Sequence, residues 1–396
     1  MVRAKNKLRI IVGGMVGQFP LGGVAWDYFH YLLGLHELGH DVYYHEDTWV
    51  WPYDPLQRSP VDQPDYTLKF LRDFFDAYAP QLAQKWHYVF LHEKHFGLSA
   101  AQFAEVARTA DIFLNVSGAC FIPQELGPRC VKVFLDTDPG YNQMMLQHKF
   151  AWSQNVQRWC AAVAEHDRHF TYAENLYGQD CTIPRGPFDW RTTRCVVSLP
   201  AWSKVRATAL PADAPMTTIM TWDYFQGRVI HEGVEYRTKL HEFERFSHLP
   251  QRTNLQLALA VGGTKAPLGR LQRQGWRILD AQASTLTPQA YQELIGRSAG
   301  EWSVAKQIYV ATRSGWFSCR TACYLAAGRP AVVQETGWSK FIPSGRGVIA
   351  FETLQQILDG LAEVAANAAA HRAAAYEIAR EYLAPDRVLV KMIEAI

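Results

Sequence analysis

The residue types best suited to hold an anion stand in one short turn, where Arg313, Ser314 and Gly315 precede Ser318. Helical spacing of apolar residues begins just after this turn and covers residues 316–327. The first N–H groups of a helix have no partners within the helix and lie at the positive end of its dipole. An arginine and two serines at that end predict a binding site for phosphate.

A polar loop follows the same helix by way of a strand. A Gly-Arg-Pro run ends the helix, and the apolar residues 330–333 predict a buried strand. This strand ends in Glu335, Thr336 and Gly337. Because ligands collect at the carboxyl ends of strands in open α/β sheets, these three residues are predicted to line the same site as the turn.

The run SGWFS, followed by a helix and by AAGRPAVVQETG, resembles the donor-binding segment of nucleotide-sugar glycosyltransferases of the GT-B type. In that family a His-x-Gly-Trp-x-Ser turn holds the diphosphate, and a Gly-x-Pro run and an acidic or amide residue follow near the sugar hydroxyls. The positions that match are Gly315, Trp316 and Ser318. Arg313 stands where the family has His, Glu335 lies in the sugar-contacting loop, and Thr321 occupies the place of a Glu that binds ribose in many members.

A strand is predicted directly before the turn, over residues 307–312, which are apolar and rich in β-branched types. The turn that leads into this strand, residues 300–306, supplies two further donor-binding candidates, Glu301 and Lys306. Lys306 could add a cation to the phosphate site, whereas a solvated lysine before a strand is the alternative.

The resemblance implies two Rossmann-like parallel-sheet domains that face each other across a cleft, the α/β architecture called GT-B. Residues 1–205 are then the acceptor-binding domain and residues 206–380 the domain that binds the nucleotide sugar. Residues 381–396 are expected to form a helix that crosses back to the first domain. The alternation of predicted strands and helices along the second half separately indicates a parallel sheet.

Two carboxylates are the first candidates for a catalytic base. Asp136 and Asp138 follow a predicted strand, residues 131–135, and stand beside a Pro-Gly turn. Either could take the proton of an acceptor hydroxyl if transfer inverts the anomeric centre, and Asp138 is the preferred one. Capping of the turn is the alternative role, and a retaining transfer needs no dedicated base. Should both be excluded, the remaining candidates are Asp27, Glu46 and Glu174.

A glycine-rich segment joins the first predicted strand, residues 8–12, to a helix over residues 24–38. Glycine lets the backbone approach a ligand closely, and in GT-B enzymes the equivalent loop faces the acceptor and the donor phosphates. The candidate acceptor-binding residues are Gly13, Gly14, Gly22 and Gly23. A tight turn without a ligand is the alternative. The aromatic, Pro-rich segment 46–65 is predicted to be a long loop that walls the acceptor.

The run HELGH at residues 36–40 matches the zinc-protease motif His-Glu-x-x-His. On a continuous helix its two histidines would share one face and could bind zinc. Its glycine is instead predicted to end the helix before a strand, residues 41–44, and no third ligand follows at the required place. We therefore expect no metal and no cofactor beyond the nucleotide-sugar co-substrate, since arginine and the helix dipole can neutralise a diphosphate.

Composition limits the possible partners. A chain of 396 residues suits two domains of about 150 to 200 residues each. A net charge of +2 lacks the basic excess of a nucleic-acid binder. No apolar run reaches the roughly 18 residues of a membrane span, and the first apolar run is predicted to be a strand and not a signal peptide. Seven scattered cysteines indicate a reducing compartment, so we expect a cytoplasmic protein.

The sequence as a whole predicts a hexosyltransferase-like glycosyltransferase that moves a sugar from a donor such as a UDP-sugar to a hydroxyl of a small molecule or glycan. A nucleotide-sugar epimerase of similar architecture is the alternative; a two-domain ligand-binding protein and a zinc metalloprotease are more distant ones. The acceptor, the sugar, the nucleotide, the stereochemistry and the oligomeric state stay open.

Overall fold

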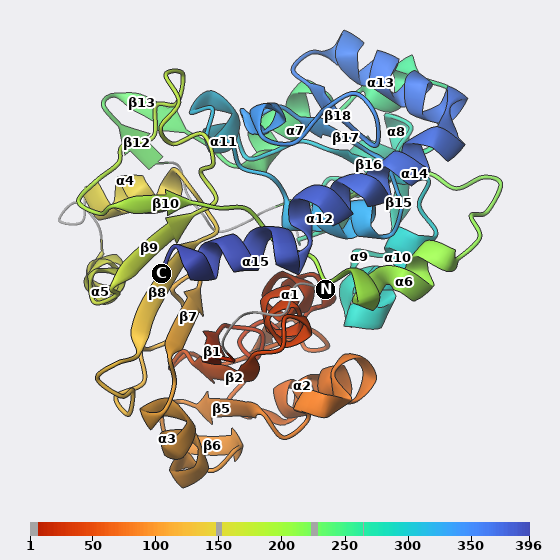
Figure 1. Cartoon of the computed structure of the whole chain (residues 1–396). Helices are drawn as coiled ribbons and strands as arrows, with labels where there is room; N and C mark the ends of the chain where they lie inside the picture. The colour runs from red at the N-terminus through yellow and green to blue at the C-terminus, as the bar shows by residue number, and fades with distance from the viewer. Residues whose placement is uncertain (1–6, 148–152, 223–228, 264) are drawn as a thin grey trace.

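Two parallel β-sheets, one in each half of the chain, dominate the computed structural model of the protein (Figure 1). The structure describes all residues except 1–6, 148–152, 223–228 and 264. The strands of the first sheet are β1 (Arg9–Gly13), β2 (Asp41–Asp47), β5 (Trp86–Phe90), β6 (Lys94–Gly97), β7 (Ile112–Val116), β8 (Val131–Asp136), β9 (Arg168–Thr171) and β10 (Trp190–Thr192). Those of the second are β11 (Met216–Thr221), β14 (Leu257–Gly262), β15 (Arg277–Leu279), β16 (Gly300–Ser303), β17 (Ala331–Gln334) and β18 (Val348–Phe351).

The order of the strands is that of two open α/β sheets. The first sheet runs β10-β9-β8-β7-β1-β2-β5-β6, and the second runs β15-β14-β11-β16-β17-β18. Among the described strands of these sheets, β5 and β6 pair antiparallel and the other neighbours pair in parallel. Strands β5, β7, β16 and β17 are buried along their whole length, as parallel strands covered on both faces must be. The predicted pair of Rossmann-like parallel sheets is confirmed.

Helices cover the sheets and fill the junction between them (Figure 1). The first half contains α1 (Gly22–Glu37), α2 (Asp65–Tyr78), α3 (Ala100–Arg108), α4 (Tyr141–Gln147), α5 (Gln154–Ala164) and α6 (Leu199–Ala207). The second contains α7 (Lys239–Arg245), α8 (Leu268–Arg273), α9 (Ala281–Thr285), α10 (Pro288–Gly296), α11 (Gln307–Ala311), α12 (Cys319–Ala326), α13 (Leu354–Ala366), α14 (Ala368–Ile378) and α15 (Pro385–Glu394). Two small hairpins are β3 (Tyr53–Asp54) with β4 (Ser59–Pro60) and β12 (Val229–His231) with β13 (Val234–Tyr236). None of the helices among the described residues is long and apolar enough to cross a membrane.

The last helix, α15, lies against α1 of the first half (Figure 1). A side chain at Gly34 of α1 would approach Leu389 and Pro385 of α15 to 2.9 Å, so the glycine is what lets the two helices pack closely. The strands of the first sheet end at residue 192, and those of the second begin at residue 216. The predicted domain boundary near residue 205 falls within α6 and stays a prediction.

Two predicted elements beside the anion turn are wrong. Residues 307–312 were expected to form a strand, but they lie in and just after helix α11; residues 300–303 were expected to be a turn, but they form strand β16. The apolar residues Ile308 and Tyr309 explain the error. Both are buried in a cluster with Tyr141 of the first half, so tertiary packing decides the conformation of a segment whose composition favours a strand.

Candidate active site

The predicted base Asp136 is a buried structural residue at the end of β8. Its Oδ1 accepts the Asp138 backbone N–H at 2.9 Å and the Asn142 side-chain amide at 2.6 Å. Its Oδ2 accepts the Gln143 amide and the Thr171 hydroxyl, both at 2.6 Å. Burial raises the pKa of Asp136 to about 6 despite these donors. With four donors and no exposed surface, the carboxylate holds the turn in shape, and a catalytic role of Asp136 stays a prediction.

The second predicted base, Asp138, reaches across to the second half of the chain. It forms an ion pair of 2.5 Å with Lys306 and accepts a hydrogen bond from the Tyr309 hydroxyl. Lys306 also lies 5.2 Å from the centre of the Tyr141 ring. The structure therefore joins two predicted site residues, Asp138 and Lys306, in a contact between the halves. A role of Asp138 as a base stays a prediction.

Asp136 should matter for stability. Asp136→Asn replaces one carboxylate oxygen with an N–H₂ group, which cannot accept the hydrogen bonds that this oxygen receives. Because the donors at that position then have no acceptor, we expect the free energy of unfolding to fall by about 2 to 4 kcal/mol. Asp138→Asn, which alters a partly exposed ion pair, should cost less than about 1 kcal/mol. Urea denaturation of the two variants compares them directly, and equal stabilities would contradict the structural role of Asp136.

The anion turn predicted at residues 313–315 is packed against the first half of the chain. The Ser314 side chain is fully buried, and its backbone carbonyl accepts the Asn175 N–H at 3.1 Å. Gly315 has a φ of +82°, and a Cβ there would lie 2.4 Å from the Asn175 nitrogen. Its N–H donates to the Thr336 carbonyl at 2.7 Å. The turn and the loop at 335–337 are therefore neighbours, as predicted, and the turn packs against the first half of the chain; phosphate binding there stays a prediction.

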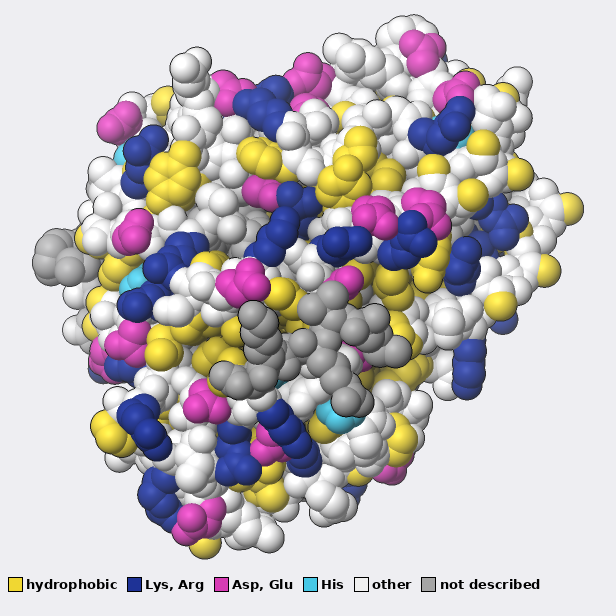
Figure 2. Space-filling view, in the orientation of Figure 1, with side chains coloured by type: hydrophobic (Ala, Val, Ile, Leu, Met, Phe, Trp, Pro, Cys, Tyr) yellow, Lys and Arg dark blue, Asp and Glu magenta, His cyan; other side chains and the backbone are white. Residues whose placement is uncertain are grey.

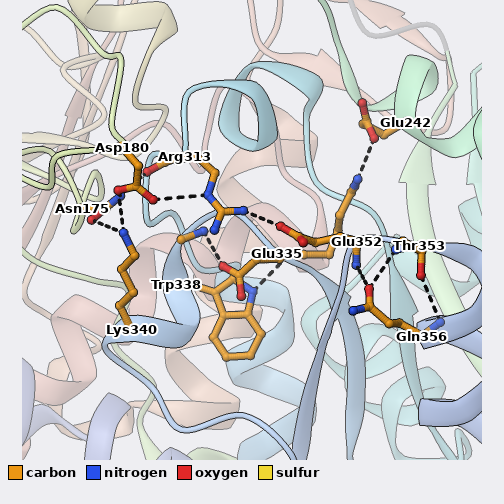
Figure 3. A network of polar contacts seen from close by, with 12 residues as sticks. Asn175, Asp180, Glu242, Arg313, Glu335, Trp338, Lys340, Glu352, Thr353 and Gln356 are labelled. Carbon is orange, nitrogen blue, oxygen red and sulfur yellow. Dashed lines mark hydrogen bonds and ion pairs between the residues drawn. The ribbon is translucent and has the colours of Figure 1, made fainter.

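Arg313 is held between two carboxylates (Figure 3). Its guanidinium forms ion pairs with Glu352 at 2.5 Å and with Asp180 at 3.6 Å. Asp180 in turn pairs with Lys340 at 2.6 Å. Helix α12 begins at residue 319, later than predicted. The Arg313 guanidinium is therefore outside the helix and is engaged in ion pairs with carboxylates. Its contact with a diphosphate stays a prediction.

The predicted sugar-contacting residues lie at the end of β17. Glu335, labelled in Figure 3, is buried and accepts the N–H of Gly337. The Thr336 hydroxyl donates to the Trp316 carbonyl at 2.6 Å, and the Trp316 indole donates to the Thr137 carbonyl at 3.3 Å. These contacts tie the loop to the first half of the chain. A contact of Glu335, Thr336 or Gly337 with a sugar stays a prediction.

A row of cations that sequence reasoning missed lies at the carboxyl end of β16. Lys239, the first residue of α7, donates to the Ser303 hydroxyl at 3.0 Å. Arg320, in the first turn of α12, donates to the same hydroxyl at 2.6 Å and to the fully buried Glu301 carboxylate at 2.7 Å. Burial lowers the pKa of Lys239 well below its usual value, and the charges of Arg320 and Lys306 lower it further. Among the described residues, Glu301 pairs with Arg320 and Lys239 has no ion-pair partner, so Lys239 lacks a counter-charge.

A cavity of about 310 Å³ adjoins this cluster, between the N-terminal end of α1 and the carboxyl ends of β11 and β14. Helices α9, α10 and α12 complete its wall. The lining residues are Leu21, Gly23, Val24, Trp26, Asp27, Ile219, Met220, Thr221, Ala260, Gly262, Ala281, Thr285, Tyr291, Cys319, Arg320 and Cys323. Most are apolar or small, and Arg320 and Asp27 bring the charge. Facing strand ends with a few convergent polar groups are the usual setting of a ligand site in α/β proteins.

Asp27 is the carboxylate in this cavity. Burial raises its pKa to about 6, and a hydrogen bond from the Cys319 thiol partly offsets that shift. The other two reserve candidates are engaged elsewhere: Glu46 accepts the N–H groups of Gly17 and Gln18, and Glu174 pairs with an arginine. An acid whose pKa lies near neutrality beside a cavity has the properties of a general base.

The glycines predicted to contact an acceptor mostly serve packing. A Cβ at Gly14 would lie 2.9 Å from the Tyr28 and Tyr44 rings, and one at Gly13 would lie 3.0 Å from a buried phenylalanine ring. A Cβ at Gly22 would lie 2.2 Å from a backbone oxygen of the second half. Gly22 and Gly23 also belong to helix α1 instead of the predicted loop, and Gly23 lines the cavity. A contact of these glycines with an acceptor stays a prediction.

The HELGH run forms a helix end, as expected. Helix α1 stops at Glu37, whose carboxylate accepts the Ser198 hydroxyl, and Gly39 has a φ of +95°. His40 lies beyond the helix, and its Nδ1 accepts the Leu8 N–H at 3.2 Å. The two histidines therefore do not share a helix face. In the described part of the chain, no three His, Cys, Asp or Glu side chains form a group that could hold a metal.

A second pocket of about 490 Å³, the histidine pocket, lies in the first half between β2, β5, β6 and α3. Its aromatic rim includes Trp49, 64% exposed, and Phe121, 45% exposed. Asp47 is buried in its wall; one oxygen accepts from His92 at 2.5 Å, and the other has no hydrogen-bond partner among the described residues. Trp49 belongs to the segment 46–65, predicted to wall an acceptor.

Comparison with solved structures places the architecture. An α-glucosyltransferase in complex with UDP and a 13-mer DNA aligns over 98% of this chain and 99% of its own with a TM-score of 0.57 and 11% identity. The chain has the GT-B fold. Sucrose-phosphate synthase from Thermosynechococcus elongatus aligns over 98% of both chains with a TM-score of 0.54 and 13% identity. HepE of Anabaena in complex with UDP and glucose covers 98% of this chain and 99% of its own, with a TM-score of 0.54 and 10% identity. No protein-family model and no curated protein sequence matches the chain.

Proposed function

We propose that this protein is a glycosyltransferase that uses a nucleoside-diphosphate sugar. The observation that carries the proposal is Lys239, a half-buried lysine without a carboxylate partner among the described residues. It shares the Ser303 hydroxyl with Arg320, which lines a cavity between the two sheets. A diphosphate is an anion that would supply the counter-charge that Lys239 lacks and would accept further hydrogen bonds from Arg320. The shared fold with glycosyltransferases solved with UDP supports the same reading.

The residues divide the work in this proposal. Lys239 and Arg320 hold the diphosphate and stabilise the charge that it gains as it leaves the anomeric carbon. The neighbouring cavity takes the rest of the donor. Asp27 removes the proton of the acceptor hydroxyl if the transfer inverts the anomeric centre. Glu335 contacts hydroxyl groups of the donor sugar, as the sequence resemblance implies.

The histidine pocket is the proposed acceptor site. Aromatic rings on its rim can stack on a sugar or an aromatic ring, and the free oxygen of Asp47 can accept from a hydroxyl. One fold relative was solved with DNA, but the net charge of +2 argues against a nucleic-acid acceptor here. The proposed acceptor is a small molecule or a glycan. The proposed location of the protein is the cytoplasm.

Trp49 should contribute to acceptor binding. Trp49→Ala removes a ring from the pocket rim, and we expect the KM for the acceptor to rise about 3- to 10-fold, the value of about 0.5 to 1.5 kcal/mol of aromatic contact. The matched control is Trp51→Ala, because Trp51 is exposed on the same loop and does not line the pocket. Initial rates at varied acceptor concentration decide, and an equal effect of both variants would contradict the acceptor site.

Activity should persist in EDTA. The diphosphate charge is met by Lys239 and Arg320 in this account, so no divalent cation is needed to stabilise the leaving group. The measurement compares the transfer rate before and after dialysis against EDTA. A loss that Mg²⁺ or Mn²⁺ restores would show that the cation cluster is insufficient.

The proposal is tested by incubating the protein with a panel of nucleotide sugars, with and without candidate acceptors, and analysing products by mass spectrometry. Release of nucleoside diphosphate that is faster with an acceptor, together with a glycosylated product, is expected. Interconversion of nucleotide sugars without transfer would favour an epimerase. Binding without turnover would favour a ligand-binding protein.

A further inference from the structure

A third cavity, of about 370 Å³, lies where the two halves of the chain and the last helix meet. The first half contributes the ends of β9 and β10, the second half contributes Phe341, and the last helix contributes one face of α15. Figure 2 shows Lys and Arg side chains gathered with Asp and Glu across the middle of the face where α12, α14 and α15 lie. We call this cavity the hinge cavity.

The charges that line the hinge cavity do not balance. Its cations are Arg191, Arg194, Arg387 and Lys391, and its carboxylates are Glu174 and Glu381. Arg194 pairs with Glu174, and Arg387 pairs with Glu381 at 3.1 Å. Arg191 and Lys391 form no ion pair with a described residue, so two positive charges stay without a counter-charge. A local excess of positive charge of this kind attracts an anion.

Two polar atoms in the wall also lack partners. Nη1 of Arg191 is a buried donor without an acceptor, and Oε2 of Glu174 is a buried acceptor without a donor, among the described residues. Buried polar atoms are rarely left unpaired, because each costs about 1 to 3 kcal/mol. An occupant that satisfies both must carry anionic oxygen for the arginine and an O–H for the glutamate.

We propose that the hinge cavity binds a phosphate monoester whose organic part carries a hydroxyl group. The phosphate lies between Arg191 and Lys391, and the hydroxyl donates to Glu174. Arg194 also reaches the Phe341 carbonyl of the second half at 3.5 Å. The ligand therefore contacts both halves and α15 at once, and its binding stabilises their mutual arrangement, which makes the cavity an effector site separate from the proposed donor site.

The test is calorimetric titration of the full chain with inorganic phosphate, methyl phosphate and glycerol 3-phosphate. Glycerol 3-phosphate, whose organic part carries hydroxyl groups, should bind at least tenfold more tightly than methyl phosphate or inorganic phosphate, which have no organic hydroxyl group. Arg191→Gln and Lys391→Gln, which each remove a cation from the cavity wall, should each weaken binding at least tenfold. Arg129→Gln and Lys204→Gln, which change exposed cations outside the cavity, should leave it unchanged.

The Lys239→Met variant separates this site from the donor site. Binding that persists in Lys239→Met and disappears in Arg191→Gln and Lys391→Gln supports the hinge cavity, whatever the activity of the protein. Binding lost in Lys239→Met and kept in the two cavity variants would place the phosphate in the donor site and overturn the proposal. Absence of binding to the wild-type chain would overturn it as well.

Discussion

Lys239→Met should lower kcat/KM for the sugar donor by about 10² to 10³, the usual loss when one preorganised group on a leaving-group charge is removed. Methionine keeps the length and the apolar stem of the side chain and deletes only the ammonium. Initial rates at varied donor concentration measure the effect. We expect both weaker donor binding and slower turnover, since the diphosphate gains charge as it leaves.

Stability separates this effect from unfolding. The pKa of Lys239 is lowered in the folded protein, so the folded state disfavours the charged form, and stability rises as pH increases from the folded to the unfolded pKa. Because pH 7 lies below the unfolded pKa, the lowered pKa of Lys239 costs stability there, and Lys239→Met should be at least as stable as the wild type. Lys204→Met, at an exposed position of α6, is the matched control. Unchanged kcat/KM in a folded Lys239→Met protein would remove the cluster from the donor site.

Asp27→Asn should lower kcat by about 10² to 10⁴ and leave donor affinity nearly intact, the loss expected when a general base is removed. The wild-type rate should depend on the ionised carboxylate. Because burial raises the pKa of Asp27 to about 6, the rate should fall about tenfold per pH unit below pH 6 and level off above it. Rate measurements from pH 4.5 to 8 check both expectations.

The pH dependence of stability provides a second readout for Asp27. Its folded pKa lies above the unfolded value of 3.8, so its favourable contribution is present below pH 3.8 and is lost as pH rises through about 6. Because asparagine does not ionise, the stability of Asp27→Asn does not fall in this way as pH rises. The variant should therefore be at least as stable as the wild type at pH 7. Full turnover in this variant would show that no base acts at this position, as a retaining transfer would allow.

The fold could be predicted from local patterns. Apolar runs between helical segments marked parallel strands, and the strand expected over residues 330–333 is β17, Ala331–Gln334. The packing of Gln307–Ala311 could not be read in this way, because its apolar residues meet α4 of the first half and not a neighbouring strand. Contacts with residues distant in the sequence therefore determine that this segment is a helix and not a strand.

The site was harder to predict than the fold. Arg313 and Asp136 have the right chemistry, but one is neutralised by two carboxylates and the other is saturated by four donors. Lys239, Arg320 and Asp27 come from three helices and share no motif. For Arg320 a local signal existed, since it stands near the start of the helix predicted over residues 316–327; for Lys239 the chain offered none.

Calorimetric titration of the wild-type chain with UDP, and then with GDP, ADP and TDP, tests the central claim most directly. We expect one saturable site for at least one of these nucleotides. Its affinity should be at least tenfold weaker in Lys239→Met than in the wild type and unchanged in Lys204→Met. Such a loss corresponds to about 1.4 kcal/mol or more, within the range of a charge-assisted hydrogen bond. Absence of binding to all four nucleotides, or equal affinity in the wild type and Lys239→Met, would contradict it.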